Sequence, residues 1–125
     1  MGTPFHRTTL ELLRSVREVE IETSRASGTT RHQTTIWVVV DAEDRVLIRT
    51  YLGPGSRWYR EALSNPECRL RAGDRTLDVR AVPAADEARI DAYNTELLRK
   101  YPRSTSTPFM LADQVLPTTM ELLPR

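Results

Sequence analysis

Residues 49–66 read RTYLGPGSRWYREALSNP, a stretch in which a strand runs through a glycine turn into a short helix. Gly53 and Gly55 let the backbone approach a ligand closely. Pro66 ends the helix, because its ring excludes helical continuation. Backbone N–H groups in the first turn of a helix lack internal partners and stabilise an anion. The stretch therefore predicts a strand–turn–helix unit that can bind an anion where the helix begins.

Hydroxyl, guanidinium and aromatic side chains gather at this same turn. Ser56 is placed to cap the helix, and Arg57, if it points inward, offers two parallel donors to a phosphate or carboxylate. An ordinary structural interpretation is equally open, because Gly-Pro-Gly-Ser is a common turn. Trp58 and Tyr59 are likewise compatible with a packed core or an interface. The residues alone leave both interpretations standing.

Length and composition limit what this unit belongs to. The 125 residues are 39% hydrophobic, which fits a single domain spanning residues 1–125. The formal net charge of +1 gives no electrostatic case for binding nucleic acid or an anionic membrane. No apolar run reaches the roughly 18 residues of a membrane span, and the start of the chain lacks a secretory profile. We expect a cytoplasmic protein.

The residue types that carry common chemistry are sparse. Cys68 is the only cysteine, which excludes an intrachain disulfide and favours a buried structural thiol over a nucleophile. His6 and His32 have no partner at a metal-ligand spacing, so we expect no metal site. Hydrolase elbows, phosphate loops and dinucleotide fingerprints are absent from the sequence. Catalytic residues are therefore not identifiable, although Tyr51 and Tyr59 are conceivable proton donors.

The chain before the turn predicts a helix followed by strands. Within residues 1–17, Thr8 or Thr9 can cap a helix. Val19 and Ile21 alternate with glutamates, which indicates a half-exposed strand.

A polar turn should follow at residues 24–30, with Gly28 at the reversal. Residues 32–41 form a continuous run of strand formers that we expect to be the central strand, buried on both faces. A tight loop at residues 41–44 should join it to a strand over residues 46–51.

The chain after the turn predicts a helix over Arg57–Ser64, a hairpin around Gly73, a helix over residues 86–101, and a tail, 102–125, with a short strand at 118–123. Residues 18–84 would make the core of a closed or partly closed antiparallel barrel, because the connections are too short for repeated crossover helices. The expected class is mainly β with flanking helices (α+β).

The order of strand, Arg-Val-Leu-Ile-Arg-Thr-Tyr, Gly-x-Gly-Ser-Arg, helix, Asn-Pro and strand resembles the split β-barrel, FMN-binding-like superfamily of pyridoxamine 5'-phosphate oxidase and the deazaflavin (F-420)-dependent reductases. Residues 34–82 are most similar to a small bacterial family of that superfamily with no assigned function. The resemblance covers most of residues 18–123. Two differences stand out: Trp58 occupies the place of a lysine in the oxidases, and Lys100 is the only lysine in the chain.

The resemblance implies a homodimer with two cofactor sites across its interface. The cofactor would be FMN or the deazaflavin coenzyme, with its phosphate held at the end of one strand and the start of the next helix. Trp37 would pack near the ring. The residues that the resemblance assigns to cofactor binding are Thr34, Thr35, Ile36, Arg49, Thr50, Ser56, Arg57 and Trp58.

Three functions remain open at this point. The first is an oxidoreductase that passes hydride from a flavin or deazaflavin to a small organic substrate. The second is a cofactor-binding or carrier protein without turnover. The third is a cofactor-free barrel that binds a small molecule or another protein.

Overall fold

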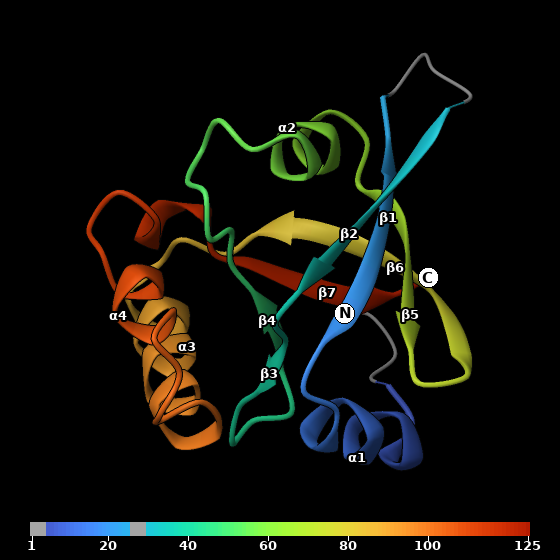
Figure 1. Ribbon diagram of the computed structural model, residues 1–125. Helices are drawn as coiled ribbons and strands as arrows, with labels where there is room; N and C mark the ends of the chain where they lie inside the picture. Colours follow the sequence, from blue (N-terminus) through green and yellow to red (C-terminus); the bar gives the residue numbers. More distant parts are fainter. Residues whose placement is uncertain (1–4, 26–29) are drawn as a thin grey trace.

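One curled antiparallel sheet of seven strands forms a half-barrel, with helices packed around it (Figure 1). The computed structural model describes residues 5–25 and 30–125. The strand order is β2-β1-β5-β6-β7-β4-β3, and every neighbouring pair is antiparallel. The strands are β1 (Val19–Ser24), β2 (Arg31–Ile36), β3 (Val39–Val40), β4 (Val46–Ile48), β5 (Glu67–Ala72), β6 (Arg75–Pro83) and β7 (Met120–Pro124).

The chain connectivity itself requires the sheet to curl. Strands β2 and β3 lie at opposite edges of the sheet, yet only Trp37 and Val38 separate them in sequence. Three residue steps span at most roughly 11 Å, whereas the edges of a flat seven-stranded sheet would lie roughly 29 Å apart. The two edges therefore approach one another where this linker joins them.

Helices cover the sheet on several sides (Figure 1). Helix α2 contacts β1, β2 and β6; helix α3 contacts β3 and β4; and helix α1 contacts β3. The helices are α1 (Arg7–Ser15), α2 (Arg57–Ser64), α3 (Glu87–Lys100), α4 (Thr107–Met110) and the 3₁₀ helix η1 (Leu116–Thr118). No helix in the described part of the chain is long and apolar enough to cross a membrane.

Strands β3 and β4 are buried on both faces because each face meets a different core. Val38, Val40 and Ile48 belong to the core inside the half-barrel, while Val39 and Leu47 pack against α3 in a second core. The burial on both faces expected for residues 32–41 is confirmed for β3 and is wrong for β2, where Gln33 and Thr35 are exposed. The expected central position is wrong, since both β2 and β3 are edge strands and the outer face of β3 is covered by a helix rather than flanked by more sheet.

Predictions for single helices, turns and residues agree with the structure in part. The helix over Arg57–Ser64 has its predicted bounds, and the hairpin turns at Gly73 as expected. The predicted threonine cap of the first helix is wrong, because α1 begins at Arg7, with His6 in the N-cap position, two or three residues before the predicted caps. Cys68 is buried, and burial raises the pKa of its thiol to about 11, which suits a structural role. The predicted reversal at Gly28 lies outside the described residues.

Candidate functional site

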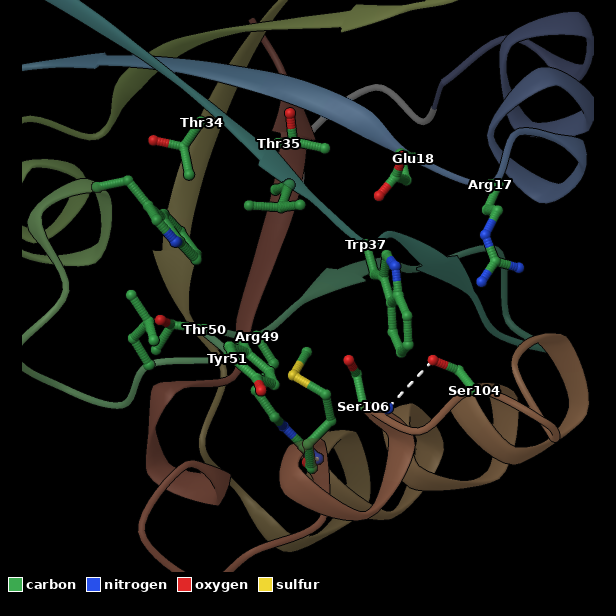
Figure 2. Close-up of a pocket in the computed structure, with 14 residues that line it drawn as sticks. Arg17, Glu18, Thr34, Thr35, Trp37, Arg49, Thr50, Tyr51, Ser104 and Ser106 are labelled. Carbon is green, nitrogen blue, oxygen red and sulfur yellow. Dashed lines mark hydrogen bonds between the residues drawn. The ribbon is translucent and has the colours of Figure 1, made fainter.

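A cavity of about 430 Å³ lies beneath β2, between that strand and the segments that follow β4 and α3 (Figure 2). It is bounded by β2 and the β2–β3 linker, by the end of the α1–β1 connection, by the loop after β4, by α2, and by the loop that leads into α4. Its lining residues are Arg17, Glu18, Thr34, Thr35, Ile36, Trp37, Arg49, Thr50, Tyr51, Leu52, Trp58, Ser104, Ser106 and Met110.

Trp37 stands at the break between β2 and β3, where the chain passes from one edge of the sheet to the other. Its ring stacks on Tyr101 with centroids 3.9 Å apart and planes 2° from parallel. The Tyr101 hydroxyl donates to the Arg17 carbonyl at 2.6 Å, and burial raises the pKa of this phenol to about 12. Figure 2 shows Trp37 extending from the linker toward Ser106. The stack thus gives the cavity a rigid, flat aromatic wall.

Arg49 borders the cavity, but its guanidinium is bound to other parts of the protein. Nε donates to Thr119 Oγ1 at 2.8 Å, and Nη1 donates to Asn94 Oδ1 at 2.7 Å. Nη1 also donates to the Met110 carbonyl at 2.8 Å, and Nη2 to the Ile90 carbonyl at 3.3 Å. An arginine has five N–H donors, so one remains. The contact of Arg49 with a phosphate stays a prediction, and this side chain has little left to offer it.

The same guanidinium lies 4.0 Å from the centre of the Tyr93 ring, an attractive cation–π geometry. Burial lowers the pKa of Arg49 to about 10, and no carboxylate in the described residues offsets that effect. Arg49 therefore joins β4 to α3, α4 and the start of β7 through neutral acceptors alone.

Thr50 and Ser56 bind each other across the glycine turn. Thr50 Oγ1 donates to Ser56 Oγ at 2.9 Å, and the Ser56 amide donates to the Gly53 carbonyl at 3.1 Å. Gly53 has φ 85°, a backbone conformation that glycine adopts without strain. Ser56 occupies the N-cap position of α2, as predicted, but its hydroxyl makes no cap hydrogen bond. Thr50 lines the cavity and Ser56 does not.

The other predicted residues separate into two groups. Thr34, Thr35 and Ile36 of β2 line the cavity together, as does Trp58 of α2. Arg57 is exposed at the first position of α2 and is not part of the lining. The phosphate-binding cluster expected at the start of α2 is therefore not assembled around this cavity.

Trp58 lies in the packed core, one of the two positions that the sequence left open for it. The side chain is 4% exposed and packs in the core inside the half-barrel, with the Tyr59 ring set edge-on at 6.2 Å. The sequence at the start of an amphipathic helix does not indicate whether an aromatic side chain faces a partner protein or the core. Trp37, the other tryptophan, is half-buried.

A buried carboxylate holds β2 against α2. Glu61 is 5% exposed; Thr23 Oγ1 donates to its Oε1 at 2.8 Å, and His32 Nδ1 lies 3.0 Å from Oε2. Burial alone would raise the pKa of Glu61, but the hydrogen bonds from Thr23 and His32 outweigh it and the pKa is lowered. His32 and Thr34 share one face of β2. The Glu61–His32 pair thereby fixes the strand that carries the threonines of the cavity.

Sequence reasoning missed part of the lining because those residues come from distant segments. Arg17 and Glu18 follow α1, while Ser104, Ser106 and Met110 come from the region after α3. None belongs to a motif. The one usable signal is the hydroxyl-rich run Ser-Thr-Ser-Thr at residues 104–107, which lies in the predicted tail. Of the two tyrosines considered as proton donors, Tyr51 lines the cavity and Tyr59 does not.

In residues 5–25 and 30–125, no three histidine, cysteine, aspartate or glutamate side chains come together in a group that could hold a metal ion. What the cavity offers is a flat aromatic wall, hydroxyl groups and one buried cation. This arrangement is suited to binding a flat, polar-edged molecule.

The chain belongs to the DUF2255 family, described as uncharacterized proteins conserved in bacteria, whose profile matches residues 9–122. This agrees with the expected small bacterial family of the split-barrel superfamily. No curated protein sequence matches the chain.

Solved structures share the fold at low sequence identity. An F420-H2 dependent reductase, FDR-A, has a TM-score of 0.65 and 18% identity, with 85% of this chain and 93% of that chain covered. A pyridoxamine 5'-phosphate oxidase-like protein from Listeria innocua has a TM-score of 0.66 and 13% identity, covering 94% and 91%. The heme storage protein HutZ from Vibrio cholerae has a TM-score of 0.68 and 12% identity, covering 98% and 92%.

Other similar structures are longer, and this chain spans 56% and 52% of two of them. The shared fold is therefore the split barrel, as the sequence predicted. At these identities the likeness establishes architecture and leaves ligand and reaction to the site itself.

Proposed function

We propose that the protein is an oxidoreductase that binds FMN or the deazaflavin coenzyme beneath β2 and passes hydride to a small organic substrate. The observation that carries the proposal is the cavity of about 430 Å³ with the Trp37–Tyr101 stack as its wall. Its volume is within the range of roughly 300–1,000 Å³ that is usual for small-molecule and cofactor sites. The shared fold with FDR-A and the oxidase-like protein supports the same class.

The residues present fit a flat heterocycle. Trp37 offers a ring on which it would stack, and Ile36 and Trp58 add apolar surface. Thr34 and Thr50 offer hydroxyl groups to the polar edge of the ring, while the side chain of Thr35, the next residue along β2, points to the opposite face of the strand. The hydroxyl of Thr50 already donates to Ser56, so it remains available as an acceptor.

A bound reduced flavin or deazaflavin would supply a hydride, which is two electrons and one proton, to an unsaturated carbon of the substrate. The protein's own contribution is to hold the ring against Trp37, to limit water, and to orient the substrate. Completing the reduction needs one further proton, which comes from solvent or from the Tyr51 hydroxyl at the cavity edge. No other catalytic assignment is required of the chain.

We further propose that the chain forms a homodimer that closes this cavity. Tyr51 and Leu52 line the cavity yet are 49% and 77% exposed, and Phe109, set edge-on to Tyr51, is 58% exposed. A second copy that covers these side chains would remove apolar surface from water and shield the ring. Light scattering at micromolar concentration should give a dimer, which Leu52→Glu weakens. A monomer for the unaltered protein contradicts this proposal.

Two alternatives are less well supported. A haem site, suggested by the shared fold with HutZ, has no histidine to use, because neither His6 nor His32 lines the cavity. A cofactor-binding or carrier protein without turnover is favoured by one observation, the small number of titratable groups at the cavity.

The proposal also assigns the protein to the cytoplasm, where reduced cofactors and the free thiol of Cys68 are maintained.

The test is a titration of the cofactor-free protein with FMN and, separately, with the deazaflavin coenzyme. Binding at micromolar or lower concentration is expected for one of them, with Thr34→Val weakening it and the matched control Thr95→Val, on the exposed surface of α3, leaving it unchanged. Consumption of the reduced cofactor with a panel of unsaturated compounds then separates an oxidoreductase from a carrier. Absence of binding by both cofactors contradicts the proposal.

A further inference from the structure

A second cavity, of about 320 Å³, adjoins the first where α3 ends. Arg17 and Ser104 line both cavities, so the two meet at these residues. Trp37 lines the first and Tyr101 the second, and their stacked rings stand between the two. The residues that line the second cavity are Arg17, Lys100, Tyr101, Pro102, Arg103 and Ser104.

Lys100, the only lysine of the chain, is held at this cavity by neutral groups. Its Nζ donates to the Leu13 carbonyl at 2.9 Å and to the Val38 carbonyl at 2.7 Å. An ammonium group has three donors, so one N–H remains for a further acceptor. No carboxylate in the described residues pairs with it, and burial lowers its pKa to about 8. At neutral pH it is therefore mostly a cation without a counter-ion.

Two more cations border the same space. Arg17 lies 5.8 Å from the centre of the Tyr101 ring, and Arg103 follows Pro102 in the exposed loop after α3. Within the described ranges, neither arginine takes part in an ion pair. Three cationic side chains and a serine hydroxyl, with no acidic residue in the lining, make this cavity locally positive in a chain whose net charge is only +1.

An acidic residue of the first cavity also favours the second cavity for an anion. Glu18 lines the first cavity and not the second. Its carboxylate disfavours an anionic group under β2 and leaves the second cavity as the favourable place. The start of α2, where the sequence predicted phosphate binding, offers less: Arg49 has four of its N–H groups bound within the protein, and Arg57 is outside the lining.

We propose that Arg17, Lys100, Arg103 and Ser104 form an anion-binding site that receives the phosphate of the ligand whose flat ring lies under β2. This inference rests on the proposed function for the ring, while the phosphate site can be tested without it. The two arginines supply planar forks that match a phosphate, Lys100 supplies a fixed point charge, and the Ser104 hydroxyl supplies a neutral donor.

The experiment compares ligands that differ only in the phosphate. FMN and riboflavin are titrated by calorimetry, and the deazaflavin coenzyme is compared with its phosphate-free chromophore. The unaltered protein should prefer the phosphorylated member of a pair. Arg17→Gln and Arg103→Gln should each weaken that member by roughly 10- to 100-fold, the effect of losing a charge-assisted hydrogen bond, and leave the phosphate-free member unchanged.

Arg99→Gln is the matched control, because Arg99 neighbours Lys100 on α3, is exposed, and is absent from the cavity lining. Like the two test variants, it removes one positive charge, but it should change the affinity for neither the phosphorylated nor the phosphate-free ligand. If Arg57→Gln, and not the two cavity variants, abolishes the preference, the phosphate lies at the start of α2 and the inference is overturned. Equal affinity for both members of each pair overturns it as well.

Inorganic pyrophosphate separates failure of this inference from failure of the proposed function. If no ring-containing ligand binds, but pyrophosphate binds and the affinity falls in Arg17→Gln and Arg103→Gln, the anion site stands and the redox proposal fails. If neither ring-containing ligands nor pyrophosphate bind, both fail. Since both arginines are exposed, these variants are expected to fold, which equal thermal midpoints would verify.

Discussion

Arg49 and Lys100 are both withdrawn from solvent without a carboxylate partner, and they differ in how far the protein satisfies them. Arg49 donates four hydrogen bonds that tie β4 to α3, α4 and the start of β7. Lys100 donates two and borders a cavity with its third donor unassigned. A buried cation whose donors are used serves structure, whereas one with a donor left beside an open cavity is suited to a ligand.

The largest expected effect is the loss of stability when Arg49 is replaced. Arg49→Met should lower the free energy of unfolding by roughly 3 kcal/mol or more, because several buried acceptors lose their donor at once. Arg49→Lys should fall between Met and the unaltered protein, since an ammonium group cannot reproduce the planar fork. Urea unfolding measures both. A loss below about 1 kcal/mol for Arg49→Met would remove the structural role assigned to this arginine.

A third buried charge, Glu61, extends the comparison because its carboxylate is hydrogen-bonded to both Thr23 and His32. Its pKa is lowered in the folded state, so its contribution to stability is present above its ordinary value of 4.5 and is lost as the pH falls below that. Glu61→Gln should cost about 1 kcal/mol at pH 7. The difference between Glu61→Gln and the unaltered protein should shrink as the pH is lowered below 4.5. A difference that stays constant from pH 7 to acid would contradict the lowered pKa of Glu61.

A pH-dependent effect concerns Lys100, whose pKa is lowered by burial from 10.5 to about 8. Between these pH values the unfolded chain binds more protons at this site than the folded chain, so stability rises with pH. The charged or titratable groups around it are Arg17, Arg103 and Tyr101, and the variant is compared with the unaltered protein so that their titration cancels. The unfolding free energy of the unaltered protein minus that of Lys100→Met should increase from pH 8 to pH 10. A flat difference would show that Lys100 titrates normally.

The sequence predicted the architecture well because strand and helix signals are local. The turn at Gly53, the helix Arg57–Ser64 and the hairpin at Gly73 follow from neighbouring residues. The position of β3 at an edge could not be predicted, because a continuous apolar run looks the same whether strands or a helix cover its outer face. The helix that covers β3 is α3, which lies about fifty residues further along the chain. The residues around β3 therefore do not indicate which of its faces a helix covers.

The site was predicted in part for the same reason. Thr34, Thr35, Thr50 and Trp58, which the resemblance assigns to cofactor binding, line one cavity. Arg17, Arg103 and Ser104 are brought together by the ends of α1 and α3, and no spacing in the sequence marks that meeting. The resemblance assigns Arg49 to the cofactor phosphate, but its side chain is directed to α3 and α4, a direction that the motif does not encode.

The central claim, that the cavity beneath β2 holds a flat cofactor against Trp37, is tested most directly by fluorescence of a protein with a single tryptophan. The chain has two tryptophans, and Trp58→Phe leaves only Trp37 as the reporter. Titration with FMN or the deazaflavin coenzyme should quench Trp37 emission saturably, with a midpoint equal to the calorimetric dissociation constant of the same variant. Cofactor binding by calorimetry without any quenching of Trp37, or no binding of either cofactor to the unaltered protein, would contradict the account.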